Sequence, residues 1–439
     1  MSKGFKNIII YTFLFFTFSL LASLSAEAQN KNQLAFEYFR NKEYDKASTL
    51  FYELYQERKS QYYRTYYVHC LIYSDEFDKA EKFIRKELRA NSNDITLLID
   101  QAYVWEEQGK TDKAQKAYEN IIDDHAYSKQ SVNKLANSFL RKRKYDLAEK
   151  VYKKGRSVMG TQDYFYKLAQ LYSVQRNYPK MVETYLDLLE SDPRYLDQVR
   201  ARLQNAGSND VQDNLPPVLE SALISRIKKN PSKDVFGVLL IWHYVQQAKY
   251  DKAVDYAKSL DKRNNESGKR LYRLGETAFN NNRPKTGQEC FKHIYENYGR
   301  RSPYYFSAKK IELSWEYNEI SQKVSPSEKE ILKLKDNIIE LRKQAPRKLH
   351  YPLTILLAKL QTFYLNKPEE ALKQIDSLIS ARKLDKEQNS KIRILKGDIY
   401  LANENPWEAS LIYADVEQQN KNNPTGYEAK FKKEKLAYY

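Results

Sequence analysis

The chain repeats one short phrase at an almost constant spacing, and this repetition limits its fold more than any other feature. The first four copies end in alanine and follow at steps of 33, 34 and 34 residues: Tyr44-Asp45-Lys46-Ala47, Phe77-Asp78-Lys79-Ala80, Thr111-Asp112-Lys113-Ala114 and Tyr145-Asp146-Leu147-Ala148. A further step of 33 reaches Met181, behind Asn177-Tyr178-Pro179-Lys180. A fixed step of this length indicates stacked copies of one supersecondary unit rather than a single globular core.

Three further positions keep the same phase around these anchor residues. A large apolar or aromatic residue stands four residues after each anchor: Phe51, Ile84, Tyr118, Tyr152 and Tyr185. A bulky residue stands nine before it: Tyr38, Leu71, Trp105, Phe139 and Tyr172. A small residue stands twelve before it in four of the five copies: Ala35, Ala102, Ala136 and Ala169, with Val68 in the second. Small residues let two helices approach closely, and bulky residues fill the groove between them.

This pattern of small and aromatic positions resembles the tetratricopeptide repeat, a 34-residue unit of two antiparallel helices. The resemblance implies an all-α fold, a right-handed α-solenoid of helix-turn-helix repeats. The phase returns at Ala253, Gly287, Ala371 and Ala409, so the resemblance covers most of the chain. It implies that one set of small residues serves repeat packing: Ala35, Ala47, Ala80, Ala102, Ala114, Ala136, Ala148, Ala169, Ala253, Gly275, Gly397 and Ala409.

The same phase predicts how the chain is organised. Residues 1–28 are expected to be a signal peptide, and residues 29–195 an N-terminal array of about five repeats. Residues 196–301 are expected to hold a degenerate helix pair and two further units. Residues 302–350 have the pattern of an atypical pair of long helices, near Tyr304–Gln322 and Ser327–Gln344. Residues 351–439 are expected to hold C-terminal units, the last of them incomplete.

The first 28 residues have the three-part layout of a secretory signal peptide. Lys3 and Lys6 precede an apolar run from Ile8 to Leu24, and Ala26-Glu27-Ala28 is a small-x-small cleavage pattern. An uncleaved N-terminal anchor is the alternative, because the run approaches the length that spans a bilayer. No transmembrane helix is expected after removal of the signal. The predicted location is the periplasm, the outer-membrane surface or the outside of the cell.

The sequence carries no catalytic, metal-binding or cofactor-binding signature. No HExxH, GxSxG, P-loop or GxGxxG pattern occurs. The five histidines, His69, His125, His243, His293 and His350, have no metal-ligand spacing, and His243 reads as a packed residue. Cys70 and Cys290 form no CxxC pair and are expected to be small buried hydrophobes. We therefore expect no enzyme activity, no cofactor and no metal.

The formal net charge of +17 allows several classes of acidic partner. The basic residues are spread along the chain among acidic ones, which favours a solvated helical surface over a dedicated polyanion site. Export removes the simplest use of the charge, intracellular nucleic-acid binding, so no nucleic-acid partner is expected. A protein partner and association with the cell envelope are expected instead.

In tetratricopeptide repeats the first helix of each pair lines a concave, ligand-binding surface. Carried over by position, the candidate partner-binding residues are His69, Tyr73, Tyr103, Asn133, Asn137, Arg141, Tyr166 and Gln170. The clamp with which some family members hold a peptide carboxylate is not reproduced in consecutive units. Most of the 37 tyrosines fall on packing positions, but a few are surplus, including Tyr62, Tyr63, Tyr66 and Tyr67. Exposed tyrosine is a common anchor for peptides and glycans.

The sequence therefore predicts a non-catalytic scaffold for protein–protein interactions. It resembles exported tetratricopeptide proteins of Gram-negative bacteria that organise outer-membrane assembly, secretion or cell-wall machinery. The Lys-, Asn- and Tyr-rich composition is compatible with a Bacteroidota-like source. The alternative is a protein that binds glycan or cell-wall polymer through basic and aromatic groove residues.

Overall fold

The computed structural model describes residues 30–160, 162–381 and 384–438, so the predicted signal peptide at residues 1–28 lies outside the described residues. Within these ranges the chain forms α-helices, three short 3-10 helices and turns, and it contains no strand. The predicted all-α solenoid class is confirmed. The chain divides into two compact units, Met1–Ala222 and Leu223–Tyr439, with the division inside helix α12 (Leu215–Lys229).

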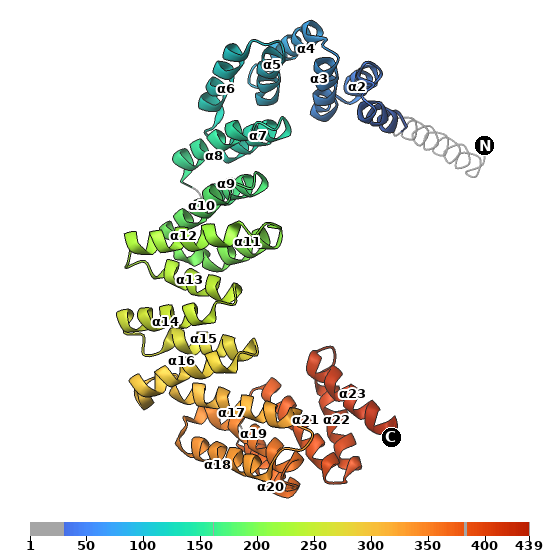
Figure 1. Ribbon diagram of the computed structural model, residues 1–439. Helices are drawn as coiled ribbons and strands as arrows, with labels where there is room; N and C mark the ends of the chain where they lie inside the picture. The colour runs from blue at the N-terminus through green and yellow to red at the C-terminus, as the bar shows by residue number, and fades with distance from the viewer. Residues whose placement is uncertain (1–29, 161, 382–383, 439) are drawn as a thin grey trace, which may run out of the picture. The chain divides into compact units, whose positions relative to one another are not determined.

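Unit 1 consists of antiparallel helix pairs that follow one another along the chain (Figure 1). It begins with a helix over residues 30–40. Its further helices are α2 (Tyr44–Arg58), α3 (Gln61–Tyr73), α4 (Phe77–Ala90), α5 (Ile95–Glu107), α6 (Thr111–His125), α7 (Lys129–Arg141), α8 (Tyr145–Met159), α9 (Asp163–Val174), α10 (Tyr178–Ser191), the 3-10 helix η1 (Pro193–Tyr195), α11 (Leu196–Ser208) and the start of α12.

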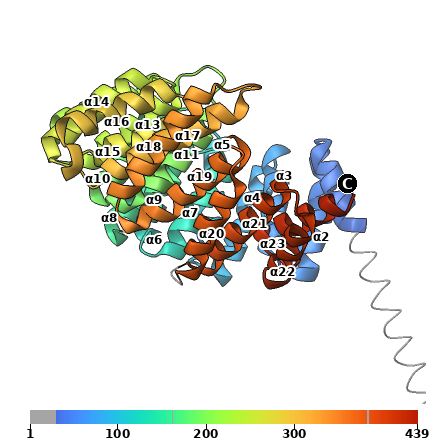
Figure 2. The ribbon, with the colours of Figure 1, turned by 90° about the horizontal axis from the view of Figure 1, so that it is seen from below.

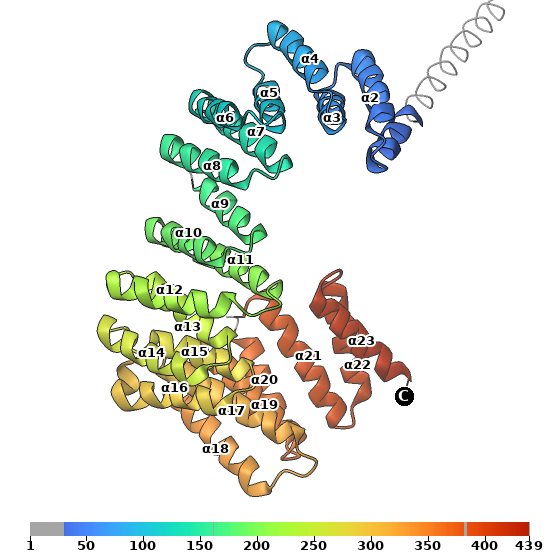
Figure 3. The same cartoon turned by 45° about the horizontal axis from the view of Figure 1, so that its top comes forward.

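The two helices of each pair lie in separate layers of unit 1. Figures 1 and 3 show α5, α7, α9 and α11 following one another along one side, and α6, α8 and α10 along the other. Helix α5 packs against both α3 and α7, and α6 packs against α8, so these neighbouring pairs also touch within each layer. The first helices therefore form one shared surface, and a ligand on that surface can touch several repeats.

Unit 2 contains more pairs of the same kind and one longer pair. Its helices are α13 (Asp234–Gln246), α14 (Tyr250–Asn264), α15 (Lys269–Asn280), α16 (Pro284–Asn297), η2 (Gly299–Arg301), α17 (Tyr305–Gln322), α18 (Glu328–Gln344), η3 (Arg347–Leu349), α19 (His350–Phe363), α20 (Pro368–Ser380), α21 (Lys386–Ala402), α22 (Pro406–Gln419) and α23 (Pro424–Tyr438). Helices α17 and α18, of 18 and 17 residues, form the longer pair. Figures 2 and 3 show α21, α22 and α23 side by side.

The packing positions are buried as the pattern requires. The alanines of the predicted packing set are at most 1% exposed, and Gly275 and Gly397 are buried. A Cβ atom on Gly397 would lie 2.5 Å from Cε1 of Tyr413, four residues after the anchor Ala409. A Cβ atom on Gly275 would likewise strike the ring of Phe291. The small residue of the first helix thus makes room for the bulky residue of the second.

The turn inside each repeat is the same in the nine pairs that carry the anchor phase. The residue five positions before the anchor has positive φ each time: Lys42, Asp75, Gly109, Arg143, Arg176, Ala248, Asn282, Asn366 and Glu404. In most pairs the next N–H then bonds the carbonyl of the bulky residue nine before the anchor, as Glu76 N does to Leu71 O at 2.8 Å. These bonds satisfy carbonyls that the end of a helix leaves without partners.

This turn gives a first testable prediction. Gly109 has φ +79°, so Gly109→Ala places a Cβ in the left-handed region and is expected to lower the free energy of unfolding by about 1 kcal/mol. Ala248 has φ +53°, and Ala248→Gly is expected to cost nothing or to stabilise. Gly207 lies in the last turn of α11, and a Cβ there would meet Leu215 Cδ2 at 3.9 Å, an ordinary contact distance, so Gly207→Ala is the matched control and should stabilise. Urea unfolding, followed by circular dichroism, measures the free energy of unfolding of all three variants. An equal decrease for Gly109→Ala and Gly207→Ala would contradict the left-handed conformation at Gly109.

Candidate partner-binding site

Unit 1 has a cavity of about 550 Å³ on its first-helix layer. It is bounded by the helix over residues 30–40, by one face of α3 and by the end of α7. The lining residues are Phe39, Gln61, Tyr62, Thr65, Tyr66, His69, Tyr73 and Arg141. Three separate repeats thus contribute to one cavity.

Aromatic rings form most of the cavity wall. Tyr66 makes an edge contact with Phe39, with the ring centres 5.1 Å apart, and it lies equally close to the ring of Tyr62. Tyr73 lies 6.2 Å from Phe39, also between ring centres. Tyr62 and Tyr73 are 53% and 46% exposed, so the ring faces remain available to a ligand. Exposed, mutually packed tyrosines offer rigid contact area at low entropic cost.

A buried ion pair lies under the cavity. The ammonium of Lys142, directly after α7, lies 2.8 Å from Oδ1 of Asp100 on α5, and the two side chains are only 5% and 1% exposed. The same ammonium lies 3.1 Å from Nε2 of His69 and 4.4 Å from the centre of the Tyr103 ring. Since an ammonium only donates, Nε2 of His69 accepts this bond. Helices α3, α5 and α7 are therefore joined by one charged group.

Arg141 is the cation at the cavity. It is exposed, and its Nη2 donates a hydrogen bond to the hydroxyl of Ser138 at 3.3 Å, one turn earlier on α7. Within the residues that the structure describes, no carboxylate forms an ion pair with Arg141. The cavity thus presents an uncompensated guanidinium next to aromatic rings.

The structure brings together some of the sequence-predicted groove residues and separates others. His69, Tyr73 and Arg141 line the cavity, and Tyr103 lies over Lys142 beside it. Asn133 and Asn137 lie on α7 outside the lining, the first half-buried and the second exposed. Tyr166 on α9 donates to Oε1 of Gln198 at 2.8 Å and packs on Tyr185 and Tyr195, and Gln170 is exposed nearby on the same helix.

The sequence reasoning missed residues of this site. Four residues lie outside the family's contact positions, and no local pattern marks them: Phe39, Gln61, Asp100 and Lys142. Tyr62 and Tyr66 did carry a signal, because they are surplus to the packing pattern, and both line the cavity. The neighbouring surplus residues have a different role: Tyr63 is buried, and Tyr67 packs against Phe83 with ring centres 4.8 Å apart.

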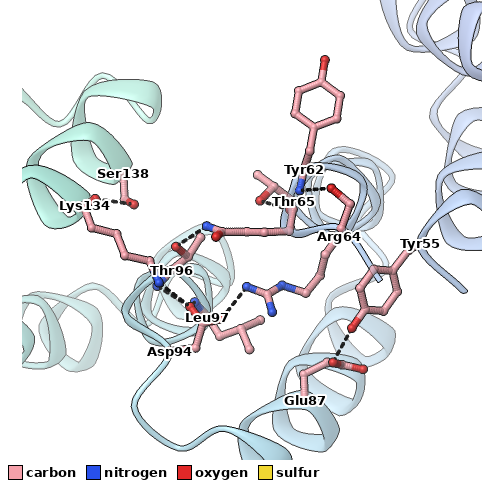
Figure 4. A network of polar contacts seen from close by, with 12 residues as sticks. Tyr55, Tyr62, Arg64, Thr65, Glu87, Asp94, Thr96, Leu97, Lys134 and Ser138 are labelled. Carbon is pink, nitrogen blue, oxygen red and sulfur yellow. Dashed lines mark hydrogen bonds and ion pairs between the residues drawn. The ribbon is translucent and has the colours of Figure 1, made fainter. Parts of the chain in front are cut away.

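A second polar network holds the same helices at their opposite ends. Figure 4 shows Arg64 of α3 and Lys134 of α7 converging on Asp94, which precedes α5. The Arg64 guanidinium donates to Asp94 Oδ2 at 2.7 Å, and Asp94 Oδ1 accepts from the backbone N–H of Thr96 at 3.0 Å. Burial would raise the pKa of Asp94, but the hydrogen bond and charge of Arg64 outweigh it, and that pKa is lowered. This network therefore joins α3, the start of α5 and α7 through one carboxylate.

His69 gives a pH prediction. Burial and the neighbouring Lys142 charge lower the pKa of His69 from 6.5 to about 4. The unfolded chain then binds this proton more readily than the folded chain, so stability is expected to fall as the pH drops from 6.5 to 4. His69→Gln keeps an acceptor for Lys142 and does not titrate. The urea unfolding midpoint should therefore fall less between pH 6.5 and pH 4 in His69→Gln than in the wild-type chain. An equal fall in both proteins would contradict the lowered pKa of His69.

The described residues carry a second cavity and an exposed apolar pair. A second cavity, of about 540 Å³, lies near the start of α8, but its Lys144 and Glu106 already pair at 2.6 Å. In unit 2, Trp407 and Leu411 are 82% and 71% exposed on α22, one turn apart.

No group of His, Cys, Asp or Glu in the described residues could hold a metal ion. Among the described helices, none combines the length and the apolar character needed to cross a bilayer.

Comparisons with known proteins agree with the repeat pattern. Residues 99–157, which cover most of α5 through α8, match the family described as tetratricopeptide repeat. No curated protein matches the sequence. Solved structures with similarity include yeast Tom70, 13% identical with a TM-score of 0.37, where the match covers 94% of this chain and 96% of that chain. A tetratricopeptide repeat protein from Parabacteroides merdae is 15% identical with a TM-score of 0.31, covering 69% and 97%.

The matched segment holds two of the predicted repeats, and the same turn and the same small-residue contacts recur in both units. Tetratricopeptide repeats support a protein-interaction scaffold, and this fold is generally non-catalytic. Residues 99–157 therefore match the tetratricopeptide repeat family, and helix pairs with the same turn recur on either side of the matched segment.

Proposed function

We propose that this protein is an exported scaffold of the bacterial cell envelope, which holds a protein partner on the first-helix layer of unit 1. The observation that carries the proposal is the aromatic cavity around His69, Tyr73 and Arg141. It joins three repeats on a continuous layer, and it exposes rings next to a cation without a carboxylate partner. The predicted signal peptide at residues 1–28 supports export, and the absence of catalytic motifs supports a binding role.

A second candidate is a glycan or cell-wall polymer as ligand. The net charge of +17 and the combination of Arg141 with tyrosine rings favour it, because anionic sugars bind to cations and stack on aromatic rings. The protein partner is preferred, because the cavity is continuous with an extended helical layer. Repeats of this type use such layers for peptide segments.

An affinity capture from envelope extract separates the two. The purified chain is immobilised and washed at moderate and then at high salt, beside a Tyr73→Ala/Arg141→Ala variant. Recovery of a defined protein by the wild-type chain and not by the variant is the expected result. Retention of cell-wall or lipopolysaccharide material that is lost as salt rises would favour the second candidate. Equal recovery by both chains would remove the cavity from the binding surface.

A further inference from the structure

The charge of the cavity indicates what kind of segment fits it. Of its lining residues, Arg141 is the one that carries a charge at neutral pH, since His69 is neutral there. We propose that this cavity binds an aspartate or glutamate side chain that lies next to an aromatic residue in an extended segment of the partner. This inference rests on the proposed function and names the chemistry of its partner.

Arg141 supplies the charge that recognises the carboxylate. Its guanidinium makes one long hydrogen bond, to Ser138 at 3.3 Å, which leaves further N–H groups directed to solvent. A guanidinium matches a carboxylate with two parallel hydrogen bonds, and it is more weakly hydrated than an ammonium. An acidic side chain is therefore the ligand group that this cation selects.

His69 lines the cavity with Arg141 as a neutral ring. Because Nε2 of His69 accepts a hydrogen bond from Lys142, the proton of the neutral ring lies on Nδ1. Lys142 keeps this tautomer in place, and it also neutralises the buried Asp100 at 2.8 Å. Glu106 on the same helix is paired with Lys144 at 2.6 Å. The negative charges of Asp100 and Glu106, which could repel a ligand carboxylate, are thus each paired with a lysine of the protein.

The rings determine what lies next to the acid. Tyr62 and Tyr73 are about half exposed and flank the cavity with Phe39 and Tyr66. A carboxylate alone would leave these ring faces in water. An aromatic side chain beside it would bury them with edge or offset contacts of the kind that Phe39 and Tyr66 already make. A peptide carrying both groups uses the whole cavity.

A selection experiment tests this chemistry even before the partner is identified. A phage-displayed library of random dodecapeptides is panned against the purified chain, against Arg141→Gln and against Arg143→Gln. Arg143→Gln is the matched control, because Arg143 lies two residues further on and does not line this cavity. Wild type and Arg143→Gln are expected to select peptides that pair Asp or Glu with Phe, Tyr or Trp. Arg141→Gln is expected to lose the acidic preference.

The selected peptide is then synthesised and measured by fluorescence anisotropy. Arg141→Gln in the protein and the acid-to-amide change in the peptide should each weaken binding about tenfold, and combining them should add little further loss. Thermal melting checks that the variants remain folded. Peptides selected without acids, or with the same acids by Arg141→Gln, would overturn this inference and leave the proposed function standing. If no peptide is selected and polygalacturonate binds in an Arg141-dependent manner, both proposals are wrong.

Discussion

Replacing Lys142 by methionine is expected to lower the free energy of unfolding by about 3–5 kcal/mol. The Lys142 side chain is 5% exposed and that of Asp100 is 1% exposed, so removing the cation leaves a buried carboxylate without its counter-charge. The change also removes the donor to Nε2 of His69. Urea unfolding measures the loss directly.

Two controls separate burial from charge. Lys150→Met breaks an ion pair of the same 2.8 Å length with Glu119, but both side chains are about half exposed, and the expected change is below about 1 kcal/mol. The double variant Lys142→Met/Asp100→Leu replaces both buried charges by apolar groups and should recover most of the loss. A Lys142→Met loss no larger than that of Lys150→Met would show that the pair is hydrated in solution.

Replacing Phe139 by alanine is expected to cost about 3–5 kcal/mol, because it opens a cavity between two successive repeats. Phe139 is fully buried on α7 and meets Tyr118 of α6 edge to face, with ring centres 5.5 Å apart. Phe139 stands nine residues before its anchor, and Tyr118 four after the previous one. The contact between Phe139 and Tyr118 therefore joins one repeat to the next.

The matched control for this change is Tyr127→Ala, which removes an aromatic ring between α6 and α7 that is 66% exposed. Its expected effect is within about 0.5 kcal/mol. Phe139→Leu keeps most of the buried volume and should cost less than half as much as the alanine variant. If Phe139→Ala and Tyr127→Ala unfold at the same urea concentration, the two repeats do not depend on this contact.

The fold could be predicted from the sequence because its signals are local and periodic. The second helix of a pair begins three residues before its anchor, at Tyr44 as at Pro406, and the repeated aspartate lies in its first turn, where it complements the helix dipole. The shared turn geometry could not be predicted from the sequence, because the left-handed position is glycine in one pair, at Gly109, and another residue in the others, such as Lys42 or Asp75. Its constancy comes from the helix-pair geometry, which forces the same backbone conformation on different residues.

The candidate site was only partly predictable, and the reason is physical. Family positions point to His69, Tyr73 and Arg141 individually, but their meeting depends on how far apart α3 and α7 lie across α5. The pairing of Lys142 with Asp100 joins residues from two repeats, and neither residue carries a periodic signal. Contacts of this kind arise from the stacking of repeats, which a single sequence does not encode locally.

Site-specific photo-crosslinking tests the central claim, that a partner protein occupies the first-helix layer of unit 1. A photoreactive phenylalanine is placed in the full chain in its native host, at Tyr73 in the cavity or at Tyr127, which is more exposed but lies outside it. The account predicts a discrete crosslinked protein from position 73 and none from position 127. A crosslinked protein from position 127 alone, or none from position 73, would contradict it.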